Sequence, residues 1–239
     1  MTITICDVGP RDGLQNDPTT LAPEVRAELV DRLAAAGLPR IEAVSFVNPA
    51  RVPQMAGAEE VVAAIERLPG VVYAGLVLND RGYDRLRETE LEEAHFAFAA
   101  SEEFNRRNAG AAVEDSVQSA ERIVARAHED SIRVTVTIGT AFGCPFEGHV
   151  DPERVLEIAA RVVEGGADEI VFADTVGVGV PRQIRQLVSE SVKLGAHRGL
   201  EDRRIVLEPV ARADVADRDR HGLSAEDSGP RGGGVRPAS

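Results

Sequence analysis

Hydrophobic and polar positions along this chain follow two alternating periodicities. Short runs rich in Val and Ile, such as residues 132–140, alternate with longer stretches in which apolar side chains recur every three or four positions. In the stretch 23–36, Val25, Leu29 and Leu33 share one face of a helix, and Gly37 follows as a stop signal. This alternation is typical of α/β proteins, in which helices connect neighbouring parallel strands.

The pattern predicts six strand–helix units and the start of a seventh. The expected strands cover residues 2–8, 41–47, 71–77, 95–99, 132–140, 169–173 and 204–207. The expected helices cover residues 23–36, 58–68, 81–89, 113–129, 152–165 and 181–194. A closed (β/α)₈ barrel needs eight units, whereas an open doubly wound sheet can stop earlier, so periodicity alone leaves both architectures open.

The alternating pattern ends after Leu207. Residues 208–220 carry charges on every face, and residues 229–239 consist mainly of Gly, Pro and Arg. These segments predict no eighth strand and no closing helices. We therefore expect a folded domain over residues 1–207 and an aberrant, disordered tail over residues 208–239.

Composition and charge narrow the functional classes. The net charge of −13 argues against nucleic acid and anionic membranes as partners, because both require clustered Lys and Arg. No apolar run approaches the roughly 18 residues of a membrane span, and the first residues resemble a strand and not a signal peptide. Two cysteines, Cys6 and Cys144, cannot build a disulfide framework. We therefore expect a cytoplasmic protein in a reducing compartment.

Polar side chains follow the first two expected strands, where the loops of a parallel α/β protein build its active site. Arg11 is suited to stabilising an enolate, and Asp12 is a hard ligand for a divalent metal, although a simple turn with an ion pair is the alternative. Glu42 lies inside an apolar strand, where a buried carboxylate needs a cation. If Glu42 points into a barrel interior, that cation is expected to be Arg11. The alternative is that the Glu42 side chain faces the surface.

A third group follows the sixth expected strand. Asp174 and Thr175 precede Gly177 and Gly179, which superficially suggest a dinucleotide-binding loop. That interpretation is weak, because Arg182 occupies the place of the third glycine and the loop lies outside a first βαβ unit. Asp174 and Thr175 are better placed at the mouth of a barrel. The polar segments 100–108 and 143–148 are predicted as loops. In the first, Arg106 and Arg107 are expected either to be solvated or to contact the phosphate of an anionic cofactor.

Together these segments resemble the 3-hydroxy-3-methylglutaryl-CoA lyase family. The matching pieces follow the family's order over about residues 2–195: residues 8–15 (VGPRDGLQ), 41–42 (IE), 45–49 (SFVNP), 52–55 (VPQM), 99–108, 143–148 (GCPFEG) and 174–179 (DTVGVG). The related isopropylmalate and homocitrate synthases usually carry a Leu-Arg-Asp-Gly-x-Gln version of the first motif. The Gly-Pro-Arg-Asp-Gly-Leu-Gln version therefore indicates the lyase branch.

The resemblance implies a TIM (β/α)₈ barrel, incomplete here, with strand seven partial and strand eight absent. It also implies a carbon–carbon lyase that cleaves the acyl-CoA substrate 3-hydroxy-3-methylglutaryl-CoA to acetyl-CoA and acetoacetate, as in leucine catabolism, with Mg²⁺ or Mn²⁺ as cofactor. The implied roles are metal binding for Asp12, enolate stabilisation for Arg11, support of Arg11 for Glu42, proton transfer for Asp174, and substrate binding for Gln15, Ser45 and Thr175. The oligomeric state stays open, with a homo-oligomer as one option.

The sequence departs from the family at its end. The His-x-His pair that binds the metal is absent, since His197 and His221 lack that spacing, and the family's glycine-rich Cys loop is missing. Pro209 argues against Glu208 as a replacement ligand. We therefore expect a damaged metal site and negligible activity.

A frameshift near residue 207 is one origin of these departures. Read one nucleotide later, the codons of residues 217–222 permit an apolar helix, and those of residues 231–235 permit Gly-Gly-Gly-Gly-Cys. Sequencing the 3′ end of the gene tests this hypothesis; an intact frame without an alternative barrel ending rules it out. The alternatives are another superfamily member, namely an isopropylmalate synthase-like condensing enzyme or an aldolase, and a non-enzymatic barrel fragment that pairs with another chain.

Overall fold

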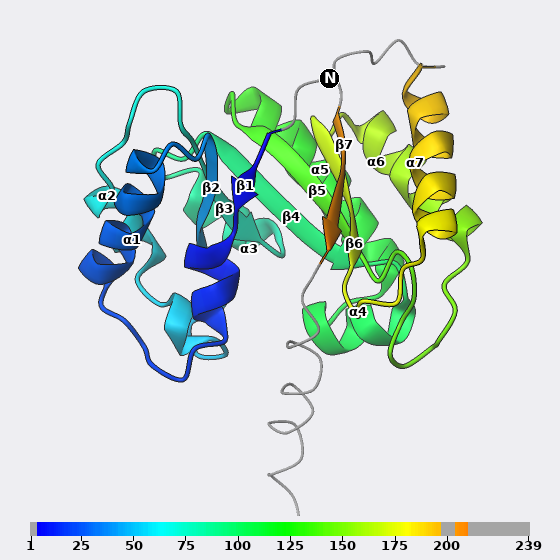
Figure 1. The fold of residues 1–239 in the computed structure, drawn as a ribbon, viewed down its shortest axis with the longest axis horizontal. Helices are drawn as coiled ribbons and strands as arrows, with labels where there is room; N and C mark the ends of the chain where they lie inside the picture. Colours follow the sequence, from blue (N-terminus) through cyan, green and yellow to red (C-terminus); the bar gives the residue numbers. More distant parts are fainter. Residues whose placement is uncertain (1–3, 197–203, 210–239) are drawn as a thin grey trace, which may run out of the picture.

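The computed structural model describes residues 4–196 and 204–209, and over these residues the chain forms one curled parallel sheet (Figure 1). Its seven strands follow one another in chain order, each paired in parallel with the next. The strands are β1 (Cys6–Asp7), β2 (Arg40–Ser45), β3 (Val72–Val77), β4 (Glu93–Ala99), β5 (Arg133–Gly139), β6 (Glu169–Asp174) and β7 (Arg204–Pro209).

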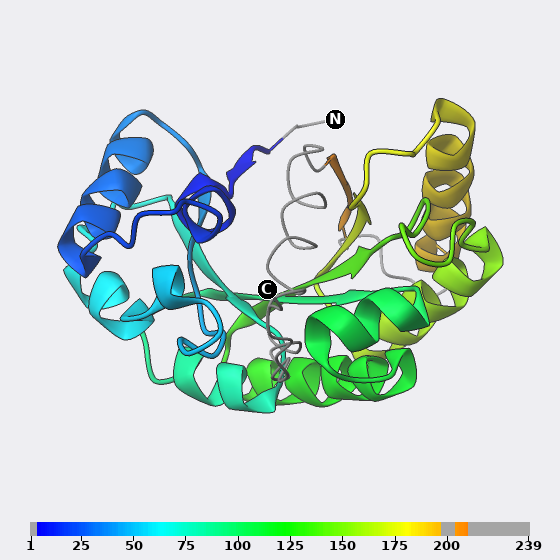
Figure 2. The ribbon, with the colours of Figure 1, turned by 90° about the horizontal axis from the view of Figure 1, so that it is seen from below.

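Helices cover the convex outer side of this sheet (Figure 2). They are α1 (Pro23–Ala35), α2 (Ala58–Ala64), α3 (Asp80–Leu86), α4 (Glu102–Ala109), α5 (Val113–Glu129), α6 (Pro152–Gly165) and α7 (Pro181–Ala196). Two short turns complete the described elements: η1 (Gly9–Gly13), a single π-helical turn, and η2 (Pro53–Met55), a 3₁₀ turn.

Strands β1 and β7 are the two edges of the described sheet, which therefore does not close. The predicted incomplete α/β barrel is confirmed over these residues. Strand β7 pairs with β6 along its whole length from Arg204 to Pro209, two residues past its predicted end. Most of the predicted tail, residues 210–239, lies outside the described residues.

The alternation within each strand explains which side of the sheet is apolar. In β5 the side chains of Val134, Val136 and Ile138 are fully buried, and they belong to the core between the sheet and the outer helices. Helix α5 buries a matching stripe that includes Val117 and Ile123. No described helix is long and apolar enough to cross a bilayer.

One predicted loop is a helix. Residues 102–109 form α4, although their sequence is almost entirely polar. Buried Asn105 explains the structure: its Oδ1 accepts from Ala99 N at 2.9 Å, and its Nδ2 donates to Ala111 O and Ser116 Oγ. The prediction was wrong because these partners lie in β4, in α5 and in the segment before α5, outside the pattern of the segment itself.

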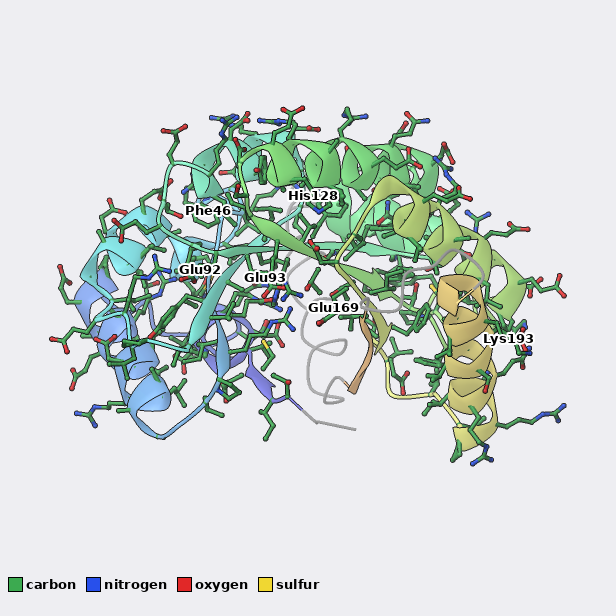
Figure 3. The ribbon with its side chains drawn as sticks, turned by 90° about the horizontal axis from the view of Figure 1, so that it is seen from above. Phe46, Glu92, Glu93, His128, Glu169 and Lys193 are labelled. Carbon is green, nitrogen blue, oxygen red and sulfur yellow. The ribbon has the colours of Figure 1, made fainter. Side chains whose placement is uncertain are left out.

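The concave side of the sheet carries buried charges where the strands begin. Arg40 donates to Glu169 Oε1 at 2.7 Å and to Thr135 Oγ1 at 2.7 Å, and it also pairs with Glu93. Figure 3 shows Glu93 and Glu169 on the concave side, whereas Lys193 lies on the outer helix α7. Burial lowers the pKa of Arg40, but the two carboxylates outweigh it and raise the pKa above its ordinary value, so Arg40 stays charged.

Replacing Arg40 by methionine tests this buried layer. Arg40→Met leaves Glu93 and Glu169 without their shared cation, and we expect it to lower the free energy of unfolding by about 3–5 kcal/mol in urea at pH 7. The matched control is Arg32→Met, which removes an exposed pair with Glu28 on α1 and is expected to cost about 0.5 kcal/mol or less. Equal losses in the two variants would contradict the layer's structural role.

Candidate active site at the mouth of the barrel

Arg11 and Asp12 lie directly after β1, in the turn η1. The turn is closed by Asp12 N, which donates to Val8 O at 2.7 Å, and Pro10 is buried beneath it. Arg11 Nη1 donates to Asp12 Oδ1 at 2.5 Å, and Arg11 Nε forms an ion pair with Glu42 Oε1. Because the Arg11 side chain is only 14% exposed, this guanidinium is held at the mouth and does not extend into solvent.

Glu42 is the buried centre of this cluster. Its side chain is 3% exposed, and its two oxygens have different partners: Oε1 meets Arg11, and Oε2 meets His95 Nδ1. Burial raises the pKa of Glu42, but Arg11 and His95 lower it more strongly, to about 2. Glu42 is therefore ionised at neutral pH. The Glu42–Arg11 pair expected from the sequence is present, and the surface-facing alternative for Glu42 is wrong.

Two polar side-chain atoms in the segments that follow β1 and end β2 are buried without a hydrogen-bond partner. They are Ser45 Oγ, in the last residue of β2, and Gln15 Oε1, just after η1. Most buried polar groups in folded proteins are paired, so unpaired ones call for a partner such as a ligand or water. Both residues were predicted to bind substrate, and that role stays a prediction.

Asp174 is the last residue of β6, and Thr175 follows it at the same end of the sheet. The Asp174 carboxylate accepts from Val178 N at 3.0 Å and from Gly179 N at 2.9 Å, so it orders its own loop. A Cβ at Gly179 would lie 2.9 Å from Asp174 Oδ2, so a larger residue there would displace this carboxylate. Thr175 Oγ1 accepts from Thr140 N at 2.7 Å. The proton-transfer role of Asp174 stays a prediction, as does substrate binding by Thr175.

Sequence reasoning missed a hydroxyl chain that joins the ends of β4, β5 and β6. Ser101 Oγ lies 3.1 Å from Thr140 Oγ1, and the backbone of Thr140 bonds to Thr175. Thr140 adopts a φ of 52°, a strained conformation for a β-branched residue that often marks functional sites. No sequence signal identifies such a backbone angle.

The described residues do not form a complete metal site. No group of three or more His, Cys, Asp or Glu side chains that could hold a metal occurs among them. Asp12 is the one ligand predicted there, and a single carboxylate holds Mg²⁺ weakly because that ion gives up its hydration reluctantly. A set of three such ligands that includes Asp12 would need a residue from outside the described part of the chain, where His197 and His221 lie.

Comparison with known proteins identifies the family of the chain. The family described as HMGL-like matches residues 2–194. The chain is 44% identical over 195 residues to (R)-citramalyl-CoA lyase of Chloroflexus aurantiacus, covering 77% of this chain and 62% of the relative. It is 39% identical over 187 residues to mitochondrial hydroxymethylglutaryl-CoA lyase of Rattus norvegicus, covering 78% and 58%.

A solved structure shows the same fold. The HMG-CoA lyase of Acinetobacter baumannii in complex with coenzyme A and 3-methylmalate matches with a TM-score of 0.77 and 29% identity, covering 86% of this chain and 76% of that one. The chain spans about three-fifths of the length of the curated relatives it matches. The matched region includes every predicted site residue, from Arg11 to Thr175. The match over residues 2–194 shows that the chain belongs to the HMGL-like family.

Proposed function

We propose that the site at the barrel mouth is that of a lyase for 3-hydroxyacyl-CoA substrates, with 3-hydroxy-3-methylglutaryl-CoA as the substrate. The observation that carries this proposal is the cluster of Arg11, Glu42 and Asp12, in which an oriented guanidinium lies beside a carboxylate at the carboxyl end of β1. The hydroxymethylglutaryl-CoA lyases among the relatives support this substrate.

The reaction is a retro-Claisen cleavage. A base removes the proton of the C3 hydroxyl, and the new carbonyl forms as the C2–C3 bond breaks. The bond's electron pair then forms the enolate of acetyl-CoA, which takes up a proton at its Cα, and acetoacetate leaves. Arg11 is suited to this step because a fixed, partly buried cation stabilises a developing oxyanion more strongly than a solvated one.

The family implies a divalent metal, and Asp12 is the described residue suited to bind it. Since the described residues do not complete the metal site, we propose that the chain as given binds its substrate but turns it over negligibly.

(R)-Citramalyl-CoA is the second candidate substrate. It is favoured by the 44% identity to the lyase of Chloroflexus aurantiacus. The cluster of Arg11, Asp12 and Glu42 offers no contact that separates the two acyl groups, so direct competition between the two thioesters decides which one the site prefers.

Substrate binding is the first test. In titration calorimetry the full chain is expected to bind 3-hydroxy-3-methylglutaryl-CoA, and Arg11→Met is expected to weaken binding about tenfold or more, the usual effect of losing one hydrogen bond to a charged group. Arg32→Met, on the exposed face of α1, is the control and should bind normally. Absence of binding by the unaltered chain would refute the lyase assignment.

Turnover is measured in the same samples by acetyl-CoA formation in excess Mn²⁺. We expect none above background. Measurable acetyl-CoA would contradict the expected inactivity while supporting the lyase assignment, and preferential use of (R)-citramalyl-CoA would replace the first substrate by the second.

Metal binding is the second test. Manganese paramagnetic resonance is expected to show weak binding by the full chain, reduced by about tenfold or more in Asp12→Asn because a ligand is lost. Asp17→Asn is the control, since the Asp17 carboxylate caps its own turn by accepting from Thr19 N at 2.7 Å. Tight binding that survives Asp12→Asn would place the metal elsewhere.

A further inference from the structure

His95 is a buried imidazole on the concave face of the sheet that the sequence motifs do not include. It lies in β4, two residues after Glu93, so both side chains lie on the same face of the strand. The residue is 6% exposed. Its two ring nitrogens contact two different groups of buried charges, which makes it the link between the strand-start layer around Arg40 and the mouth.

The Nδ1 side of His95 contacts the mouth. Nδ1 forms a hydrogen bond with Glu42 Oε2, while the other oxygen of Glu42 accepts from Arg11 Nε. A carboxylate with a single partner is free to rotate about its last torsion, whereas partners on both oxygens fix its plane. His95 and Arg11 therefore hold the two oxygens of one buried carboxylate.

The Nε2 side of His95 contacts the layer at the strand starts. It lies 3.3 Å from Arg40 Nη2 and 3.7 Å from Glu93 Oε1. Arginine only donates, so a neutral ring accepts there from Arg40, and a protonated ring donates towards Glu93. In both states Nδ1 carries a hydrogen, which Glu42 accepts.

We propose that His95 is a positioning residue for Arg11, acting through the hydrogen bond from its Nδ1 to Glu42. The reaction that Arg11 serves rests on the function proposed above, whereas the positioning of Arg11 by His95 does not. A residue that only filled the space would need no donor at Nδ1, and an aliphatic side chain would serve equally.

The charge of the surroundings supports this role. Burial lowers the pKa of His95, but Glu42 and Glu93 outweigh it and raise the pKa to about 9. A protonated His95, with Arg11 and Arg40, balances the three carboxylates of Glu42, Glu93 and Glu169. Asp12 adds a fourth carboxylate at the more exposed end of this network, where it pairs with Arg11.

Two amide substitutions separate positioning from space filling. Asparagine places its amide nitrogen near the position of Nδ1, and glutamine places it near Nε2, so His95→Asn keeps the donor to Glu42 and His95→Gln moves it. The readout is hydrogen exchange of the Arg11 Nε–H by nitrogen-15 NMR, with the signal assigned by its loss in Arg11→Lys. His128→Leu, a change at an exposed histidine of α5, is the control.

We expect a protected Arg11 Nε–H in the unaltered chain, similar protection in His95→Asn, and exchange about tenfold faster or more in His95→Gln and in His95→Leu. Equal exchange in His95→Asn and His95→Gln would overturn the proposal, even if His95→Leu failed to fold. An unprotected Arg11 Nε–H in the unaltered chain would also overturn it.

Repeating the substrate titration on these variants tests the lyase function and the positioning role of His95 separately. We expect His95→Gln to weaken binding of 3-hydroxy-3-methylglutaryl-CoA and His95→Asn to retain it. No binding by the unaltered chain, together with the expected exchange pattern, would refute the lyase assignment and leave the positioning role in place.

Discussion

The structure depends on how ionised side chains are buried inside a half-closed barrel. Each of them would be costly alone, because a charge taken out of water loses its hydration. They are stable here because each cation lies between two carboxylates. Arg11 lies between Asp12 and Glu42 at the mouth, and His95 lies between Glu42 and Glu93. Arg40 lies between Glu93 and Glu169 at the strand starts. Outside the sheet, ordinary apolar packing against the helices supplies the core.

This arrangement divides the mouth into two parts held by different forces. On the side of β1 and β2, ion pairs fix Arg11 and leave Ser45 Oγ unpaired. On the side of β4 to β6, neutral hydroxyls and backbone amides fix Thr140, Thr175 and Asp174. The ion pairs of the mouth are therefore concentrated near the start of the chain, where Asp12 also lies.

Much of this was predictable from sequence because it follows from local pattern. Most strands fall within about two residues of their predicted bounds, and the strand β5 was predicted to within one residue at each end. The pairing of Glu42 with Arg11 was predictable because burying a carboxylate without a cation costs free energy, and Glu42 lies in an apolar strand.

Other features depend on contacts between distant residues and were not predictable. Strand β4 begins at Glu93 and not at the predicted His95. These two side chains share the interior with Arg40, which lies in β2, so no local pattern indicates the contact. Helix α4 is held by Asn105, whose partners all lie outside the helix. The positive φ of Thr140 leaves no trace in residue type. The first expected strand is also shorter than predicted, with only Cys6–Asp7 paired among the described residues.

The most direct test of this account is a double-mutant cycle on Arg11 and Glu42, measured as the free energy of unfolding in urea. Arg11→Met, Glu42→Gln and the double variant are compared at neutral pH, where Glu42 is ionised. The account predicts a coupling energy of about 1 kcal/mol or more, as for residues in one buried network. Additive losses, within about 0.3–0.5 kcal/mol, would show that the two side chains do not meet in the folded chain.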